Sequence, residues 1–178
     1  MVNPVNNFRI IDLVFAPFIW NTSYMSESRG IPEQEGQRII HEGHRKRFRN
    51  CYREAWRRWN EEMPAKVRKD LCARSRATII YDFAANQALI EFDGADGVTI
   101  VDPRDNGGYL SLVFEDTVVA RLKKFRDDGL STCGITTREQ KRFAFQEPPL
   151  LGFPTIGNLV VGYVLDKLES SYKLSQKG

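Results

Sequence analysis

The residues in this sequence whose types and spacing best suit chemistry are the cations between Arg38 and Arg58. This stretch holds eight Arg or Lys residues against two acids, a net charge of +6, whereas the whole chain carries only +3. The rest of the chain therefore has a net charge of −3, so positive charge is concentrated locally. Guanidinium and ammonium groups on one helical face attract phosphates, and a guanidinium also meets a carboxylate with two hydrogen bonds. The stretch predicts contact with nucleic acid or with an acidic protein partner. The alternative is a solvated helix face whose cations pair with acids of the same chain.

The candidate contact residues come from two predicted helices. The first contributes Arg38, Arg45, Lys46, Arg49, Arg53 and Arg57, and the second contributes Lys66, Arg68 and Lys69. Three aromatic residues interleave with these cations, namely Tyr52, Trp56 and Trp59, and their rings suit stacking on unpaired bases. The alternative for the two tryptophans is burial in the core.

The sequence His41-Glu42-Gly43-His44 invites a metal or acid–base interpretation. A zinc peptidase needs two histidines four residues apart on one helical face, with a glutamate between them. These histidines are three apart, no third ligand is identified, and the cationic neighbours disfavour a divalent metal. We therefore expect no metal site, with His44 packed in a helix interface and His41 facing solvent.

The acids Asp102, Glu115 and Asp116 precede Arg121 and Lys123, an order that suggests a metal-dependent nuclease. Such a site needs at least two acids and a lysine that converge on one metal and one phosphate. Turn chemistry explains the same acids with fewer assumptions, because Glu115 and Asp116 lie between two predicted strands and Asp102 precedes a proline. We expect turns here, and the nuclease remains an alternative.

The remaining motifs exclude several classes of protein. The cysteines, Cys51, Cys72 and Cys133, fit neither a disulfide framework nor a zinc knuckle, and no His–Asp set accompanies any of them. The sequence has no glycine-rich phosphate loop or dinucleotide fingerprint, so we expect no cofactor. It has no run of roughly 18 apolar residues that would span a bilayer, and its first residues lack the features of a secretory signal. We expect a cytoplasmic protein without membrane contact.

Apolar spacing predicts two long helices joined at Met63–Pro64, the first over about 33–62 and the second over about 64–90. One face of the first helix collects Ile40, His44, Phe48, Cys51, Ala55 and Trp59, and an apolar stripe on the second collects Cys72, Ile79, Phe83 and Ile90. A short connection favours an antiparallel pair. The basic segments of both helices should then lie near each other, close to the turn.

After the helices the apolar period changes to two, which predicts a sheet. Strands are expected at 98–102, 109–114 and 117–124, a short helix at 137–145, a central strand at 159–165, and an apolar arm or short strand at 8–20. The fold class is therefore α+β in a single domain, 1–178. An arm and loop (1–32) lead into two long antiparallel N-terminal helices (33–92), which pack on a mostly antiparallel sheet of about four to five strands (93–178).

Four segments together resemble a family of small, uncharacterised bacterial proteins. They are RATIIYDFAANQALIEF (76–92), DGVTIVD (96–102), LSLVFEDTVVARLKKF (110–125) and VVGYVLD (160–166). Members of this family are often encoded beside a helix-turn-helix regulator fused to a zinc-peptidase-like domain, as in toxin–antitoxin and phage-defence loci. The resemblance covers roughly the C-terminal two-thirds and has no catalytic signature. It implies a genetic context and a protein partner, for which the regulator is a candidate, but no reaction.

These observations together predict a component of a bacterial defence or toxin–antitoxin module. It would bind nucleic acid or an acidic partner protein through its basic helical surface. Two alternatives stay open, a hydrolytic toxin such as an RNase and a pure interaction subunit or inhibitor.

Overall fold

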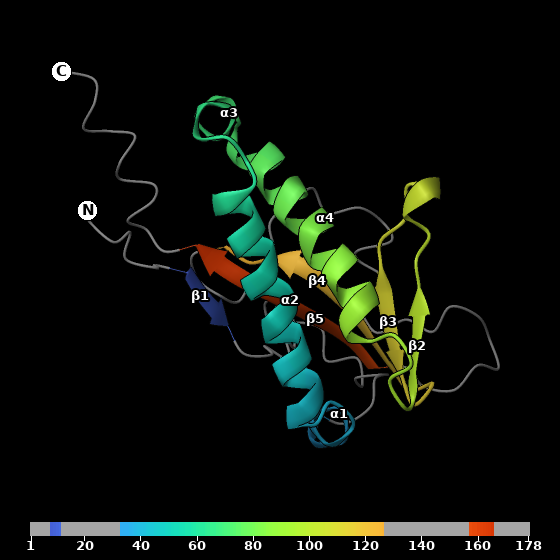
Figure 1. Ribbon diagram of the computed structural model, residues 1–178. Coiled ribbons are helices and arrows are strands. Elements are labelled where there is room, and N and C mark those ends of the chain that lie inside the picture. The colour runs from blue at the N-terminus through green and yellow to red at the C-terminus, as the bar shows by residue number, and fades with distance from the viewer. Residues whose placement is uncertain (1–7, 12–32, 127–156, 166–178) are drawn as a thin grey trace, which may run out of the picture.

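The computed structural model describes residues 8–11, 33–126 and 157–165 (Figure 1). The helices are α1 (Glu33–Ile39), α2 (Glu42–Glu61), α3 (Ala65–Asp70) and α4 (Ala73–Glu91), with a short 3-10 turn, η1 (Arg104–Asn106). The strands are β1 (Phe8–Ile11), β2 (Val98–Val101), β3 (Ser111–Phe114), β4 (Val118–Lys124) and β5 (Gly157–Leu165). The protein is α+β, as predicted. The predicted helix at 137–145, the residue Cys133 and most of the 1–32 arm lie outside the described residues.

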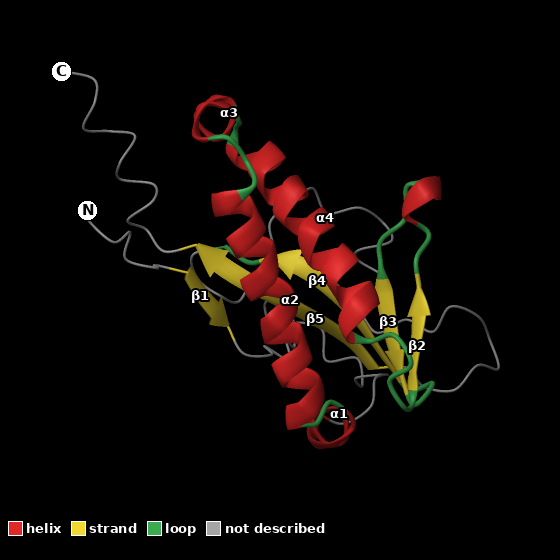
Figure 2. Ribbon diagram, in the orientation of Figure 1, coloured by secondary structure: helices red, strands yellow, loops and turns green. Residues whose placement is uncertain are grey.

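The strands form one mixed sheet in the order β1-β5-β4-β3-β2. β5 pairs parallel with β4 and antiparallel with β1, whereas β2, β3 and β4 form the predicted antiparallel meander. β5 is interior to the sheet, which agrees with the apolar run that predicted a central strand. The long helices α2 and α4 lie side by side across one face of this sheet and run in opposite directions (Figures 1 and 2).

The prediction of two uninterrupted helices is wrong, because a break divides each one. The first is interrupted before Glu42, where His41 takes an extended backbone and caps α2. The second is interrupted between Asp70 and Ala73, where Leu71 and Cys72 are both extended. Apolar spacing continues across the first break, from Ile40 to His44, so periodicity alone does not reveal it.

The buried face predicted for the first helix is confirmed. All six side chains assigned to it are buried, Ile40 just before α2 and the others on it: His44, Phe48, Cys51, Ala55 and Trp59. Beneath them lie inward-facing residues of the sheet, among them Phe114 of β3, Leu122 of β4 and Tyr163 of β5. The Tyr52 hydroxyl donates to the Val161 carbonyl at 2.9 Å, which ties α2 to the central strand.

The predicted apolar stripe of the second helix is not its buried face. Ile80, Ala84, Ala85 and Ala88 are the buried residues of α4, and Cys72 is exposed. Of the predicted stripe, Ile79 and Phe83 are partly buried against the core, and Ile90 is exposed. Small side chains let α4 approach α2 and the sheet closely, and a pattern based on large apolar residues alone does not identify this face.

Gly162 of β5 occupies a position that admits no side chain. A Cβ there would lie 2.2 Å from the Lys123 carbonyl oxygen and 2.6 Å from the Phe125 ring. Phe125 is itself buried, so the ring fills the space that the glycine leaves. This close packing belongs to the parallel pair formed by β4 and β5.

Candidate functional site

The first twelve residues of α2, from Glu42 to Arg53, carry a group of cations on the side away from the core. Arg45, Arg49 and Arg53 recur every four residues, which places them in one row along the helix, and Lys46 lies beside them. Lys46 and Arg53 are exposed, and Arg45 and Arg49 are half-buried. We call these four residues the cationic face. From Arg45 to Arg53 it extends about 12 Å along the helix axis, at 1.5 Å per residue.

Only one carboxylate among the described residues pairs with the cationic face. Glu42, in the first turn of α2, accepts from the Arg49 guanidinium. The Arg45 Nε donates to the Ile40 carbonyl at 3.2 Å, and Arg53 reaches the Asn50 amide oxygen at 3.5 Å. These neutral contacts orient Arg45 and Arg53 without neutralising their charge.

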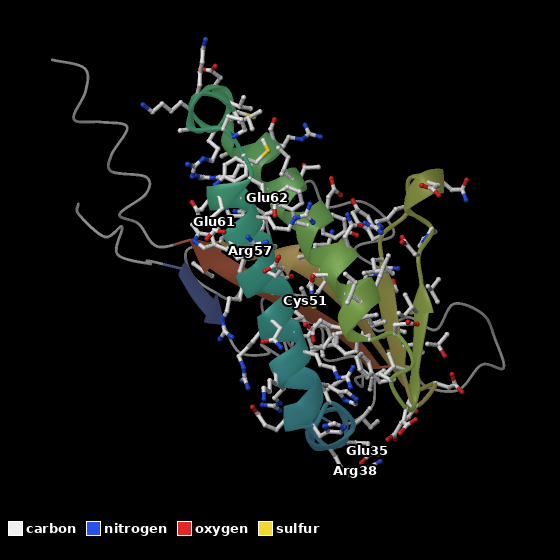
Figure 3. All side chains as sticks on the ribbon, viewed as in Figure 1. Glu35, Arg38, Cys51, Arg57, Glu61 and Glu62 are labelled. Carbon is white, nitrogen blue, oxygen red and sulfur yellow. The ribbon has the colours of Figure 1, made fainter. Side chains whose placement is uncertain are left out.

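The last two turns of α2 are arranged differently, because acids pair with Arg57 and Arg58 (Figure 3). The Arg57 guanidinium pairs with Glu54 at 2.6 Å, with Glu61 at 2.7 Å and with Glu62 at 3.1 Å. Arg58 pairs with Glu62 at 2.9 Å. The hydrogen bond from Arg57 lowers the pKa of Glu54, and the one from Arg58 lowers that of Glu62. Arg57 is thus engaged within its own helix, and it does not extend the cationic face.

The structure divides the other predicted contact residues into separate places. Arg38, in α1, pairs with Glu35 at 2.7 Å and approaches Glu115 at 3.6 Å. Lys66, Arg68 and Lys69 lie on α3, beyond the C-terminal end of α2. Arg49 and the end of α2 at Glu61 are about 18 Å apart along the helix. The cations of α3 therefore lie at the turn end of α2, where Arg68 Nη1 donates to the Asn60 side-chain oxygen at 2.9 Å, and not beside the cationic face.

The aromatic residues predicted to stack on bases are mostly in the core. Tyr52 and Trp59 are buried, and Trp56 is half-buried. Two of the three rings therefore have no open face for a base, and the alternative of core packing is confirmed for Trp59. What the cationic face offers a partner is charge and hydrogen-bond donors.

Arg47 has a structural role that its place in the basic run did not reveal. Its guanidinium donates to the carbonyl of Glu91, at the C-terminal end of α4, and lies 5.9 Å from the centroid of the Phe92 ring. Cations suit the C-terminal end of a helix, where unpaired carbonyls concentrate negative charge. The contact joins α2 to α4 and removes Arg47 from the residues available to a partner.

The two histidines adopt the predicted arrangement, since His44 is buried and His41 is exposed. Their rings stack with centroids 3.7 Å apart, and His41 Nδ1 accepts the Gly43 backbone N–H at 3.1 Å as the cap of α2. A Cβ at Gly43 would lie 2.8 Å from the His41 ring, so the glycine makes room for the cap. Burial lowers the pKa of His44. No group of three or more potential metal ligands occurs within the described residues.

The acids considered for a nuclease are turn residues. Glu115 and Asp116 have φ values of 48° and 52°, which is the left-handed geometry of a two-residue hairpin. Both oxygens of Asp102 pair with Arg104 at 2.7 Å, beside the 3-10 turn. Arg121 donates to the Ser111 hydroxyl at 3.3 Å across the sheet. These acids and Arg121 are engaged in turns and strand pairing.

Two cysteines differ in the environment of their thiols. Cys72 caps α4 and is exposed, and its Sγ lies 3.4 Å from the Ser75 hydroxyl. That hydrogen bond and the backbone N–H groups of the first turn lower the pKa of Cys72 to about 7. Burial raises the pKa of Cys51 to about 12. The spacing Cys72-x-x-Ser75 at the start of a helix is the sequence signal for the lowered pKa of Cys72.

No protein-family model, curated protein or solved structure matches this chain. The family resemblance described above therefore stays a prediction, and so does the genetic context that it implies. None of the described helices combines the length and the apolar composition needed to cross a membrane.

Proposed function

We propose that the protein binds nucleic acid by contacting the phosphate backbone with the cationic face of α2. The observation that carries this proposal is the uneven pairing of charge along one helix. The part of α2 up to Arg53 has Arg45, Lys46, Arg49 and Arg53 with Glu42, whereas three carboxylates enclose Arg57.

The position of Arg45 and Lys46, the first two cations of the face, is unfavourable for the helix itself. Cations at the end of the first helical turn oppose the positive end of the macrodipole, by about 0.3–1 kcal/mol each at the surface, and the effect does not extend to Arg49 or Arg53. Only Glu42 offsets this within the first turn. Helix stability therefore gives no reason for the arrangement, whereas binding of an anion does, since the dipole and the side chains then attract the same partner.

The type of contact follows from the side chains available. Buried Tyr52 and Trp59 leave little aromatic surface for base stacking, which supports backbone contact over readout of unpaired bases. Duplex DNA carries one phosphate charge per roughly 1.7 Å of axis, so a row about 12 Å long faces several phosphates. In the setting that the resemblance implies, this activity would serve a toxin–antitoxin or phage-defence module.

The test is fluorescence anisotropy with a labelled duplex of about 20 base pairs and an RNA strand of equal length. Arg45→Gln/Arg49→Gln removes two charges from the cationic face. Arg57→Gln/Arg58→Gln removes two charges that are paired with carboxylates at the C-terminal end of α2, so both variants have the same net charge. The proposal requires the first pair to weaken binding and the second to leave it nearly unchanged. Equal effects, or no binding by the parent protein at low salt, would refute it.

A further inference from the structure

The strand β2 forms one edge of the sheet, and the backbone groups on its outer side have no strand partner among the described residues. In an antiparallel pair, alternate residues of a strand bond to the neighbouring strand and the others face away from it. The Glu115 N–H donates to the Gly97 carbonyl at 2.8 Å, which identifies Gly97 and every second residue after it as those that bond towards β3. The N–H and carbonyl of Ile100 and the carbonyl of Val98 therefore point out of the sheet.

The side chains of β2 leave this edge accessible. Thr99 and Val101 lie on the face of the sheet away from the helices, and both are exposed, Val101 to 46%. All four residues of the strand are β-branched, and none is a Lys or a Pro, the residues that commonly block sheet edges. A strand of this kind, with unpaired backbone groups, can accept an added strand from a binding partner.

The loops at both ends of β2 carry unpaired negative charge. Residues 82–116 contain eight Asp or Glu residues and one Arg, a net charge of −7, although the whole chain is +3. Asp93 and Asp96 lie in the turns before β2, and Asp105 lies in η1 beyond its other end. All three are exposed, and none has an ion pair within the described part of the chain. The one arginine, Arg104, is already paired with a neighbouring aspartate.

We propose that the open edge of β2 binds an extended, cationic segment of a partner protein, which adds a further strand to the sheet. The segment pairs its backbone with Ile100 and places β-branched side chains beside Thr99 and Val101. At about 3.3 Å per residue, a segment of about seven residues spans roughly 23 Å, enough to cover β2 and reach both loops. Lys or Arg at each end of the segment then meets Asp96 at one end of β2 and Asp105 at the other.

The charge at this edge decides between possible occupants. Two β2 strands related by a twofold axis run antiparallel, which places the Asp96 end of each copy beside the Asp102 end of the other. Acids then face acids at both ends, so a second copy of the chain is disfavoured, and a nucleic acid is disfavoured by the same sign of charge. The edge lies nearer to α4 than to α2 (Figures 1 and 2), so the inference does not rest on the proposed function.

The first test is fluorescence anisotropy of the full chain with a labelled peptide of about seven residues, Lys-Val-Thr-Val-Thr-Val-Lys, in about 0.1 M salt. The same peptide with Glu in place of Lys should not bind. Asp96→Lys should weaken binding of the Lys peptide by roughly 4-fold, from two changed charges at about 6 Å. The matched control is Asp70→Lys, the same change at an exposed acid on α3. It should stay within about 1.5-fold of the parent, because α4, about 28 Å long, separates α3 from β2.

Two N-methylated forms of the Lys peptide distinguish strand addition from attraction of charge alone. The N–H groups of a strand alternate between its two sides, so methylating one alternate set should abolish binding and methylating the other should preserve it. Hydrogen exchange adds a readout within the protein. Binding should slow exchange of the Ile100 amide, which faces the open edge, and leave that of Thr99, which bonds β3, nearly unchanged.

Three results overturn the proposal. The first is no saturable binding of the Lys peptide with up to about 500 µM protein, a range that detects sub-millimolar dissociation constants. The second is equal binding of the two methylated forms, since the backbone of the peptide would then not pair with β2. The third is an equal effect of Asp96→Lys and Asp70→Lys, because the acids beside the edge would then not select the peptide.

Discussion

The salt dependence of nucleic-acid binding gives the most direct test of how charge is divided along α2. Each phosphate contact made by a Lys or Arg releases counterions, so the affinity falls with salt in proportion to the number of contacts. The cationic face has four such side chains, but Arg49 is paired with Glu42, so Arg45, Lys46 and Arg53 count as contacts. For duplex DNA, three contacts correspond to a slope of about −2.7 in a plot of log affinity against log salt, and to a loss of roughly 40-fold between 50 and 200 mM.

The two double variants should separate on this measurement. With Arg45 and Arg49 replaced by Gln, two contacts remain, the slope should be about −1.8, and the same rise in salt should cost only about 12-fold. With Arg57 and Arg58 replaced by Gln, the slope should stay near that of the parent protein. Those side chains are already paired with carboxylates. Arg57 also lies about 12 Å along the helix from Arg49, beyond a Debye length of about 10 Å at 0.1 M salt.

The readout is anisotropy of the labelled duplex at four or five salt concentrations, with circular dichroism to show that both variants keep the helical content of the parent. The reasoning fails if the two variants have the same slope, since total charge would then matter and its position would not. It also fails if the parent slope is near zero, because contact would then not involve phosphates.

Three further predictions concern reactivity and stability. Iodoacetamide near pH 7 should label Cys72 and spare Cys51 in the folded protein, as mapped by peptide mass spectrometry, and equal labelling would contradict the assigned environments. Because His44 has a lowered pKa when folded, its contribution to stability is complete above about pH 6.5 and declines as pH falls below that value. Urea unfolding between pH 7.5 and 5.5 should show this decline in the parent, and His44→Gln should reduce it; an unchanged decline would assign it to other groups. Gly162→Ala should lower the free energy of unfolding by about 3 kcal/mol, because its Cβ would meet the Lys123 carbonyl, and a loss below about 0.5 kcal/mol in urea unfolding would show that the strands adjust freely.

The parts of the fold that sequence predicted best are those where large apolar side chains alternate with polar ones. The buried face of α2 and the strands of the meander carry such contrast, and their predicted burial agrees with the structure. On α4 the buried and exposed faces differ little in hydrophobicity, because Ala84, Ala85 and Ala88 are small enough to lie on either side of a helix. Which side they take depends on how closely α2 approaches, and that distance is a property of the packed helices.

The candidate site was predictable in composition but not in extent. A count of cations between Arg38 and Arg58 identifies the basic helix, but it treats Arg47, Arg53 and Arg57 alike. The structure gives these three side chains different partners: a helix carbonyl for Arg47, a neutral amide for Arg53 and three carboxylates for Arg57. Glu61 and Glu62 lie outside residues 38–58, but they follow Arg57 by about one helical turn and both pair with it.

The proposed function rests on how acids are distributed along α2. Glu54, Glu61 and Glu62 gather around Arg57 at the C-terminal end, whereas Arg45 and Arg53 contact a backbone carbonyl and a neutral amide. A partner for the cationic face must therefore bring negative charge of its own. Phosphate groups along a nucleic-acid backbone meet this requirement at regular intervals, and each contact releases counterions. This is why the salt dependence of binding, rather than the affinity at one salt concentration, tests the proposal most directly.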